Sequence, residues 1–163
     1  MTKSLQERKY KTPEKLSMKP KFILVIALLF FVARSGAQTK ADDIVGLWLT
    51  GGKEPAKIQV YRSGDKYYGK IVWLKYPEAN GMARLDSKNP DKTKQKQQII
   101  GLVILQHFRF DDNEWNDGKI YDPESGKTYS CHLSLKDKNV LKVRGYVGIS
   151  LLGRTETWTR TTL

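Results

Sequence analysis

The sequence is poor in the residues that build most metal and catalytic sites. Its 163 residues include one cysteine, Cys131, and two histidines, His107 and His132. A single cysteine excludes an internal disulfide, and one cysteine with two separated histidines does not make a zinc site. The oxygen-rich segment 111–118 lacks the spacing of a calcium loop, and no serine lies in the strained turn of a hydrolase nucleophile. We therefore predict no metal, no cofactor and no enzyme activity, and we read Cys131 as a buried free thiol.

The sequence also lacks an apolar run long enough to span a bilayer as a helix, which takes about 20 residues. Its longest run, FILVIALLFFVA at 22–33, has 12 residues, which is typical of the core of a signal peptide. Lys19 and Lys21 precede this run, and the small residues of segment 35–37 (SGA) follow it. This pattern predicts cleavage after Ala37, with an uncleaved N-terminal anchor as the alternative.

We therefore predict two parts, a signal peptide over 1–37 and a single domain over 38–163. The region before the apolar run is unusually long, so translation starts either at Met1 or at Met18. The product is expected to be exported, either periplasmic or secreted, with no membrane span after cleavage. Half of the formal net charge of +12 falls within 1–37, and the remainder is spread along the chain. That distribution argues against a nucleic-acid partner, which needs a concentrated basic face.

The region after Gln38 has the pattern of an all-β domain. Turn sequences recur about every 10 residues, between segments of alternating polarity. The segments predicted as strands are eight: 44–50, 56–62, 66–75, 99–110, 115–121, 127–135, 140–147 and 154–162. The long polar connection at 76–98 is predicted to be a loop. Eight short antiparallel strands fit a small up-and-down barrel, with a two-sheet sandwich as the alternative.

The first and last predicted strands carry aromatic side chains on faces that a closed barrel would turn inward. Trp48 shares its face with Gly46, and Trp158 shares its face with Arg160. If these two strands pair to close the barrel, both tryptophans lie inside and Arg160 stacks over an indole. We therefore predict that these four residues close one end of the barrel.

Gly46-x-Trp48 and Arg160 resemble the structural signature of lipocalins and related calycin barrels. A closer resemblance, over nearly all of 38–163, is to the bacterial domain-of-unknown-function family numbered 2147. The segments that carry it are GLW at 46–48, GKI at 69–71, DSKNP at 86–90, GL at 101–102, WNDGKIYDPESGKTY at 115–129, LKVRGY at 141–146 and GRTETWTR at 153–160. The resemblance implies an exported protein with a lipocalin-like barrel, and it implies no activity.

Four polar residues near the last two strands form the candidate ligand site. If Gly145 marks a β-bulge, then Arg144, Tyr146, Arg154 and Glu156 converge at one mouth of the barrel. Such a recess would carry a net positive charge beside aromatic walls, which suits a small anionic or amphipathic ligand. With simple alternation, Arg144 instead faces solvent, and Arg154 and Glu156 form an internal ion pair.

Two classes of function remain from the sequence. The first is non-catalytic binding of a small anionic or amphipathic molecule in the cell envelope. The second is a filled barrel that acts as a structural or protein-interaction module of the envelope. The volume of the barrel interior distinguishes them, because a barrel filled by its own tryptophans has no room for a ligand.

Overall fold

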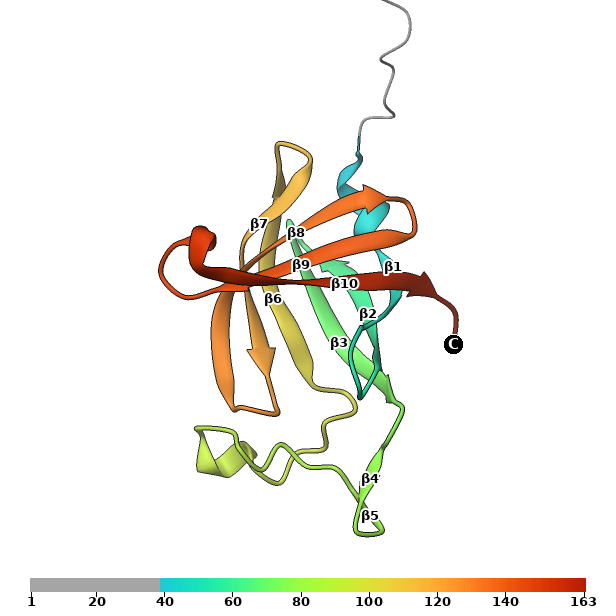
Figure 1. The fold of residues 1–163 in the computed structure, drawn as a ribbon, viewed down its shortest axis with the longest axis vertical. Coiled ribbons are helices and arrows are strands. Elements are labelled where there is room, and N and C mark those ends of the chain that lie inside the picture. The colour runs from blue at the N-terminus through green and yellow to red at the C-terminus, as the bar shows by residue number, and fades with distance from the viewer. Residues whose placement is uncertain (1–38) are drawn as a thin grey trace, which may run out of the picture. The chain divides into compact units, whose positions relative to one another are not determined.

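The computed structural model describes residues 39–163, which form a closed antiparallel barrel (Figure 1). Neighbouring strands follow the ring order β1-β10-β9-β8-β7-β6-β3-β2. The strands of the barrel are β1 (Gly46–Leu49), β2 (Ala56–Ser63), β3 (Lys66–Leu74), β6 (Val103–Asp111), β7 (Glu114–Asp122), β8 (Lys127–Asp137), β9 (Val140–Tyr146) and β10 (Gly153–Thr161). The predicted all-β barrel of eight antiparallel strands is confirmed, and the sandwich alternative is wrong. The predicted signal peptide lies outside the described residues.

The first barrel strand is shorter than predicted. Ala41–Ile44 forms the 3₁₀ helix η2, whose first turn holds Asp42 and Asp43, and β1 begins only at Gly46. The next difference lies at 99–102, which was predicted as the start of a strand. There the Leu102 amide donates to the Ile99 carbonyl at 3.1 Å, and Gly101 has a φ of 96°. This turn delays β6 until Val103 and leaves Ile100 43% exposed.

The predicted loop 76–98 contains short elements of its own. A hairpin joins β4 (Glu78–Ala79) to β5 (Met82–Ala83), and Lys92–Lys94 forms the 3₁₀ helix η3. The hairpin turn is Asn80-Gly81, with φ angles of 54° and 74°. Asn-Gly is the preferred pair for a two-residue hairpin turn, so this dipeptide was the signal that the sequence prediction missed.

The core fills the end of the barrel nearest η2. Trp48, Trp115 and Phe108 are 0% exposed, and Trp158 is 1% exposed. Gly118 leaves space for Phe108, because a Cβ at Gly118 would collide with that ring. His107, with a left-handed φ of 64°, disturbs the alternation of β6, and Leu105 and Phe108 are both buried. Among residues 39–163, no helix is long and apolar enough to cross a membrane.

Candidate functional site

The filled end of the barrel is built around Trp48 and Arg160, which face each other across the β1–β10 pair. The Arg160 guanidinium lies over the Trp48 ring, 4.2 Å from its centroid. Its Nη1 and Nη2 donate to the carbonyls of Val45 at 3.0 Å and Asp43 at 2.6 Å. A Cβ at Gly46 would lie 2.7 Å from Arg160 Nη1. The structure therefore brings Gly46, Trp48 and Arg160 into one contact that joins η2 to β1 and β10. Trp158, which was predicted to close the same end, instead lines the recess at the other end.

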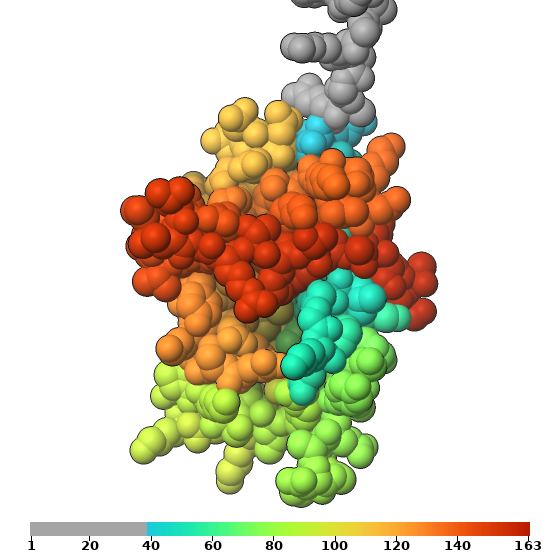
Figure 2. Space-filling view, in the orientation of Figure 1, coloured from blue at the N-terminus to red at the C-terminus, as the bar shows by residue number. Residues whose placement is uncertain are grey.

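The other end of the barrel is open, and a recess of about 750 Å³ enters the interior from there. Its apolar wall is formed by inward-facing side chains of β2, β3, β6, β7, β9 and β10: Ile58, Ile71, Ile104, Ile120, Val143 and Trp158. The rim is formed by the loop between β1 and β2, the turn between β7 and β8, and the connection between β9 and β10. Figure 2 shows the hollow beneath β10, between the β1–β2 loop and the β7–β8 hairpin.

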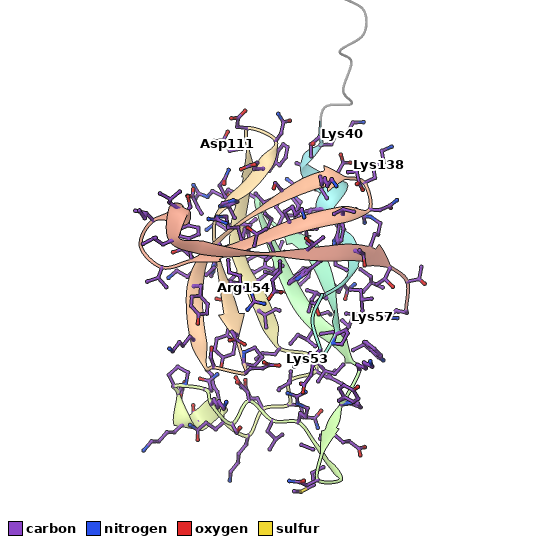
Figure 3. The ribbon with its side chains drawn as sticks, in the orientation of Figure 1. Lys40, Lys53, Lys57, Asp111, Lys138 and Arg154 are labelled. Atoms are coloured by element: carbon purple, nitrogen blue, oxygen red, sulfur yellow. The ribbon has the colours of Figure 1, made fainter. Side chains whose placement is uncertain are left out.

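Arg154 and Glu156 of β10 line this recess, on the same strand face as Trp158. Within the described part of the chain, the two side chains form no ion pair with each other, and the Arg154 guanidinium donates no hydrogen bond. Glu156 Oε2 accepts a hydrogen bond from Trp158 Nε1 at 3.3 Å. Figure 3 shows Arg154 extending from β10 toward the open end of the barrel. The expected internal pair is thus replaced by two exposed charges at the mouth.

The charge of the rim is mixed rather than net positive. The basic groups that line the recess are Lys53, Arg84 and Arg154, and the acidic groups are Glu54, Asp122, Glu124 and Glu156. Two of these are already paired, because Arg84 Nη1 lies 2.6 Å from Glu54 Oε2. Asp122 caps its own turn by accepting from the Glu124 amide at 3.0 Å. Arg154 is therefore the basic group on β10 that is available to an anionic ligand.

The structure does not bring Arg144 to the recess. β9 and β10 pair in unbroken register around Gly145, so no bulge reverses the strand there. Val143 and Gly145 line the cavity, and Arg144 lies on the outer face opposite Thr155. Its Nη1 donates to Thr155 Oγ1 at 2.8 Å. The simple alternation of β9 is the observed arrangement, and it corrects the expectation that Arg144 shares a mouth with Arg154.

Tyr146 occupies an intermediate position at the end of β9. It borders the recess, but its ring lies 6.1 Å from the ring of His132. His132 sits between the buried residues Cys131 and Leu133 and therefore faces outward. The predicted set of four thus divides, with Arg154 and Glu156 in the recess, Tyr146 at its edge and Arg144 outside.

A buried polar network closes the loop beneath the open end, and the sequence analysis did not find it. The Asp86 carboxylate is 0% exposed, and it accepts hydrogen bonds from Tyr121 Oη at 2.7 Å and Asn89 Nδ2 at 2.6 Å. Burial and the neighbouring Asp86 raise the pKa of Tyr121. Gly126, with a φ of 70°, passes so close to the Lys88 carbonyl that any Cβ would collide with it. Asp86 belongs to the segment DSKNP and Tyr121 to the segment YDPESG, so the network joins two segments that are far apart in the sequence.

The residues with the most reactive side chains lie apart from the recess. Burial raises the pKa of the Cys131 thiol to about 12, so it stays protonated at neutral pH. His107 lies on the outer surface, with its ring 5.3 Å from that of Tyr68. In residues 39–163, no group of three or more His, Cys, Asp and Glu side chains is arranged to hold a metal ion.

A closed barrel with one filled end and one open end defines the class of the protein as a lipocalin-like barrel. The structure of HP1028 from Helicobacter pylori, described as belonging to the lipocalin family, superposes with a TM-score of 0.64 at 20% identity. The alignment covers 73% of this chain and 83% of HP1028. At this identity the similarity establishes the fold alone.

The family follows from the sequence. The family model described as "Uncharacterized protein conserved in bacteria (DUF2147)" matches residues 46–160. The chain belongs to this family, as its resemblance in sequence predicted. The comparison with curated proteins gave no match.

Proposed function

We propose that the barrel binds one small amphipathic molecule, with its apolar part inside the recess and its anionic end at Arg154. The observation that carries the proposal is the recess itself, about 750 Å³ in volume and walled by aliphatic side chains beneath a charged rim. Ligand sites for small molecules typically have volumes of about 300–1,000 Å³ and combine apolar walls with a few polar groups. An eight-stranded barrel of this kind either fills its interior or holds one small ligand.

The apolar wall favours an amphipathic ligand over a small inorganic anion. Ile58, Ile71 and Val143 have hydrocarbon side chains, so this part of the wall offers no polar partner to a bare ion. Burying an apolar chain there removes its surface from water at about 25 cal/mol per Å². Because none of the charged residues that line the recess is buried, the polar end of the ligand must remain at the rim.

Arg154 supplies the polar contact of the proposed complex. Its guanidinium has donors in a planar fork that matches a carboxylate or a phosphate. The neighbouring Glu156 shares its face but already accepts from Trp158 Nε1. An anionic head group on the Arg154 side therefore meets a donor that is free within residues 39–163.

The competing function is a barrel that binds nothing inside and acts through its outer surface. The end of the barrel filled by Trp48 and Trp115 is compatible with that role, because these buried side chains leave no room for a ligand there. Titration of the protein with anilinonaphthalene sulfonate, an amphipathic anion whose fluorescence rises in apolar sites, distinguishes the two. We expect saturable binding with one site per chain. Native mass spectrometry of protein from its own host would show whether a molecule is retained.

Matched variants locate the binding. Val143→Trp fills the recess and should abolish the signal of the probe. Arg154→Gln should weaken binding by roughly 10- to 150-fold, because a charged hydrogen bond contributes roughly 1.5–3 kcal/mol. Arg109→Gln is the control, since Arg109 is exposed on β6 and lines no part of the recess. Equal affinity of the wild type and Val143→Trp would contradict the proposed site.

We also propose that the protein acts outside the cytoplasm after removal of residues 1–37. The support is the short apolar run at 22–33 and the small residues that precede Gln38. N-terminal sequencing of the protein from periplasmic and culture fractions should find Gln38 as the first residue. Recovery of the intact leader in those fractions would contradict this proposal.

A further inference from the structure

The connection between β9 and β10 carries an exposed apolar surface that ligand binding in the recess does not explain. Residues 147–152, VGISLL, contain no charged side chain, and we refer to this segment as the apolar tip. Its four large side chains are all exposed to water: Val147 69%, Ile149 61%, Leu151 80% and Leu152 75%. Figure 2 shows the tip protruding from the side of the barrel. Contiguous exposed apolar side chains mark a contact surface more often than isolated ones do.

The apolar tip is held in place by Arg144, which lies on the outer face of β9 and not in the recess. Arg144 Nε and Nη2 both donate to the Ser150 carbonyl, at 2.9 Å and 2.7 Å, and Nη2 also reaches the Leu151 carbonyl at 3.3 Å. Ser150–Leu152 forms the 3₁₀ helix η4, and the Leu152 amide donates to the Ile149 carbonyl at 3.2 Å. The carbonyls of Ile149, Ser150 and Leu151 are thus hydrogen-bonded within the fold, and the large apolar side chains of the tip remain exposed.

We propose that the apolar tip inserts into the surface of a lipid bilayer and places the mouth of the recess beside it. Apolar side chains on a narrow projection enter the region between head groups and acyl chains, where they leave water without needing a matching surface. The hydrogen bonds to the Ile149, Ser150 and Leu151 carbonyls favour this contact, because these three groups keep a partner when they leave water.

The size of the apolar tip argues against a protein as its occupant. A stable protein interface buries about 800 Å² on each partner, over roughly 20–30 residues. The tip has six residues and four large side chains. A second copy of the chain would therefore need additional apolar surface beside the tip, whereas the adjoining faces of β9 and β10 carry Lys142, Arg144 and the threonines of β10.

The position of the apolar tip connects the lipid surface with the recess. Val147 and Leu152 belong both to the tip and to the rim of the recess. A bilayer into which Val147 and Leu152 insert would therefore lie next to the mouth of the recess, where an amphipathic ligand would enter. The rim also carries Asp122 and Glu124, so the attraction is expected to come from apolar insertion more than from charge. This link to ligand exchange rests on the proposed function, but lipid binding by the tip does not.

The test measures cosedimentation of the chain beginning at Gln38 with vesicles of phosphatidylcholine, alone or with an equal part of phosphatidylglycerol. We expect binding to both, and we expect the double variant Leu151→Ser, Leu152→Ser to reduce the partition coefficient by at least about tenfold, from the loss of two apolar insertions. The matched control is Met82→Ser with Leu163→Ser, which removes two equally exposed apolar side chains elsewhere. A single Leu151→Trp reporter should shift its fluorescence to the blue on addition of vesicles.

Three outcomes would overturn the proposal. The first is that the wild type does not cosediment with vesicles. The second is that the tip variant and the control variant bind equally well. The third is that binding requires phosphatidylglycerol but persists in the variant without the two leucines. A concentration-dependent dimer that the tip variant abolishes would assign the tip to a second copy instead. Val143→Trp separates this inference from the proposed function, because it should lose the amphipathic probe and keep vesicle binding.

Discussion

Trp48 and Arg160 stabilise the filled end of the barrel through contacts of different kinds. Trp48 is fully buried and donates from Nε1 to the Ile44 carbonyl at 2.8 Å, and Arg160 covers its outer face. We expect Trp48→Ala to lower the free energy of unfolding by about 3–5 kcal/mol, as large core truncations do. Urea unfolding measures this change. The control Trp73→Ala removes an indole that is 39% exposed and should lower stability by less than Trp48→Ala does.

Tyr67 should make stability fall at alkaline pH. Burial, and then a 2.6 Å hydrogen bond from its hydroxyl to Asp42, raise its pKa from 10.0 to about 12. Between these values the unfolded chain has lost the proton and the folded chain keeps it, so the unfolded state binds fewer protons and stability falls as the pH rises. The urea midpoint should therefore decline over this window more steeply in the wild type than in Tyr67→Phe. Equal slopes would contradict the assignment.

Whether a side chain faces inward or outward was predictable where the strand alternates regularly. The prediction failed where a β-bulge was assumed. Trp48 and Trp158 lie inside, as the pattern of their strands implied, because a strand that pairs on both sides keeps its period of two. Arg144 was placed inside by treating Gly145 as a bulge, but that glycine packs inward against Ile120 and Tyr129, with no shift in register. A glycine marks a bulge or a close approach equally well, so sequence alone leaves the direction of its neighbour open.

The loop between β3 and β6 is held to the barrel by the buried Asp86. Tyr121→Phe removes one of the two side-chain donors to this carboxylate and leaves a buried acceptor without its partner. We expect a loss of about 1.5–3 kcal/mol in the free energy of unfolding, the range for hydrogen bonds to charged groups. Hydrogen exchange should also quicken at the amides of Asp86 and Asn89, which donate to backbone carbonyls of this loop.

Tyr76→Phe is the control for that prediction. Tyr76 lies at the start of the same loop and is 49% exposed, with no hydrogen bond from its hydroxyl to any described residue. Its stability and exchange should match the wild type. If Tyr121→Phe behaves like Tyr76→Phe, the network does not hold the loop.

At the scale of elements, the strands were predictable and the connections were not. All eight barrel strands fall within a few residues of the predicted segments, because each alternates in polarity between turn sequences. The recess was not predictable, since it depends on which side chains stop short of the barrel axis. The Asp86 network was missed for a related reason: it joins Asp86 to Tyr121, 35 positions apart, and no local pattern reports such a pairing.

The whole barrel depends on closure between its first and last strands. β1 has only four residues and pairs with β2 on one side and β10 on the other. Removal of β10 would leave β9 and β1 each without one neighbouring strand, and it would remove the contact of Arg160 with Trp48. Since single domains are stable by only about 5–15 kcal/mol, we expect a chain that ends at Leu152 to lose its cooperative unfolding transition. The control for this truncation is a variant in which a short glycine-serine link replaces the β4–β5 hairpin.

That hairpin pairs only with itself, and its strand residues are exposed, so its loss should leave the barrel folded. Tryptophan fluorescence and far-ultraviolet circular dichroism, followed together in urea, decide the comparison. We expect coincident transitions for the wild type and the hairpin deletion, because a single ring of strands unfolds as one unit. A cooperative transition in the chain without β10 would show that the remaining seven strands hold the fold without closure, and that the contact between Trp48 and Arg160 is not needed to complete it.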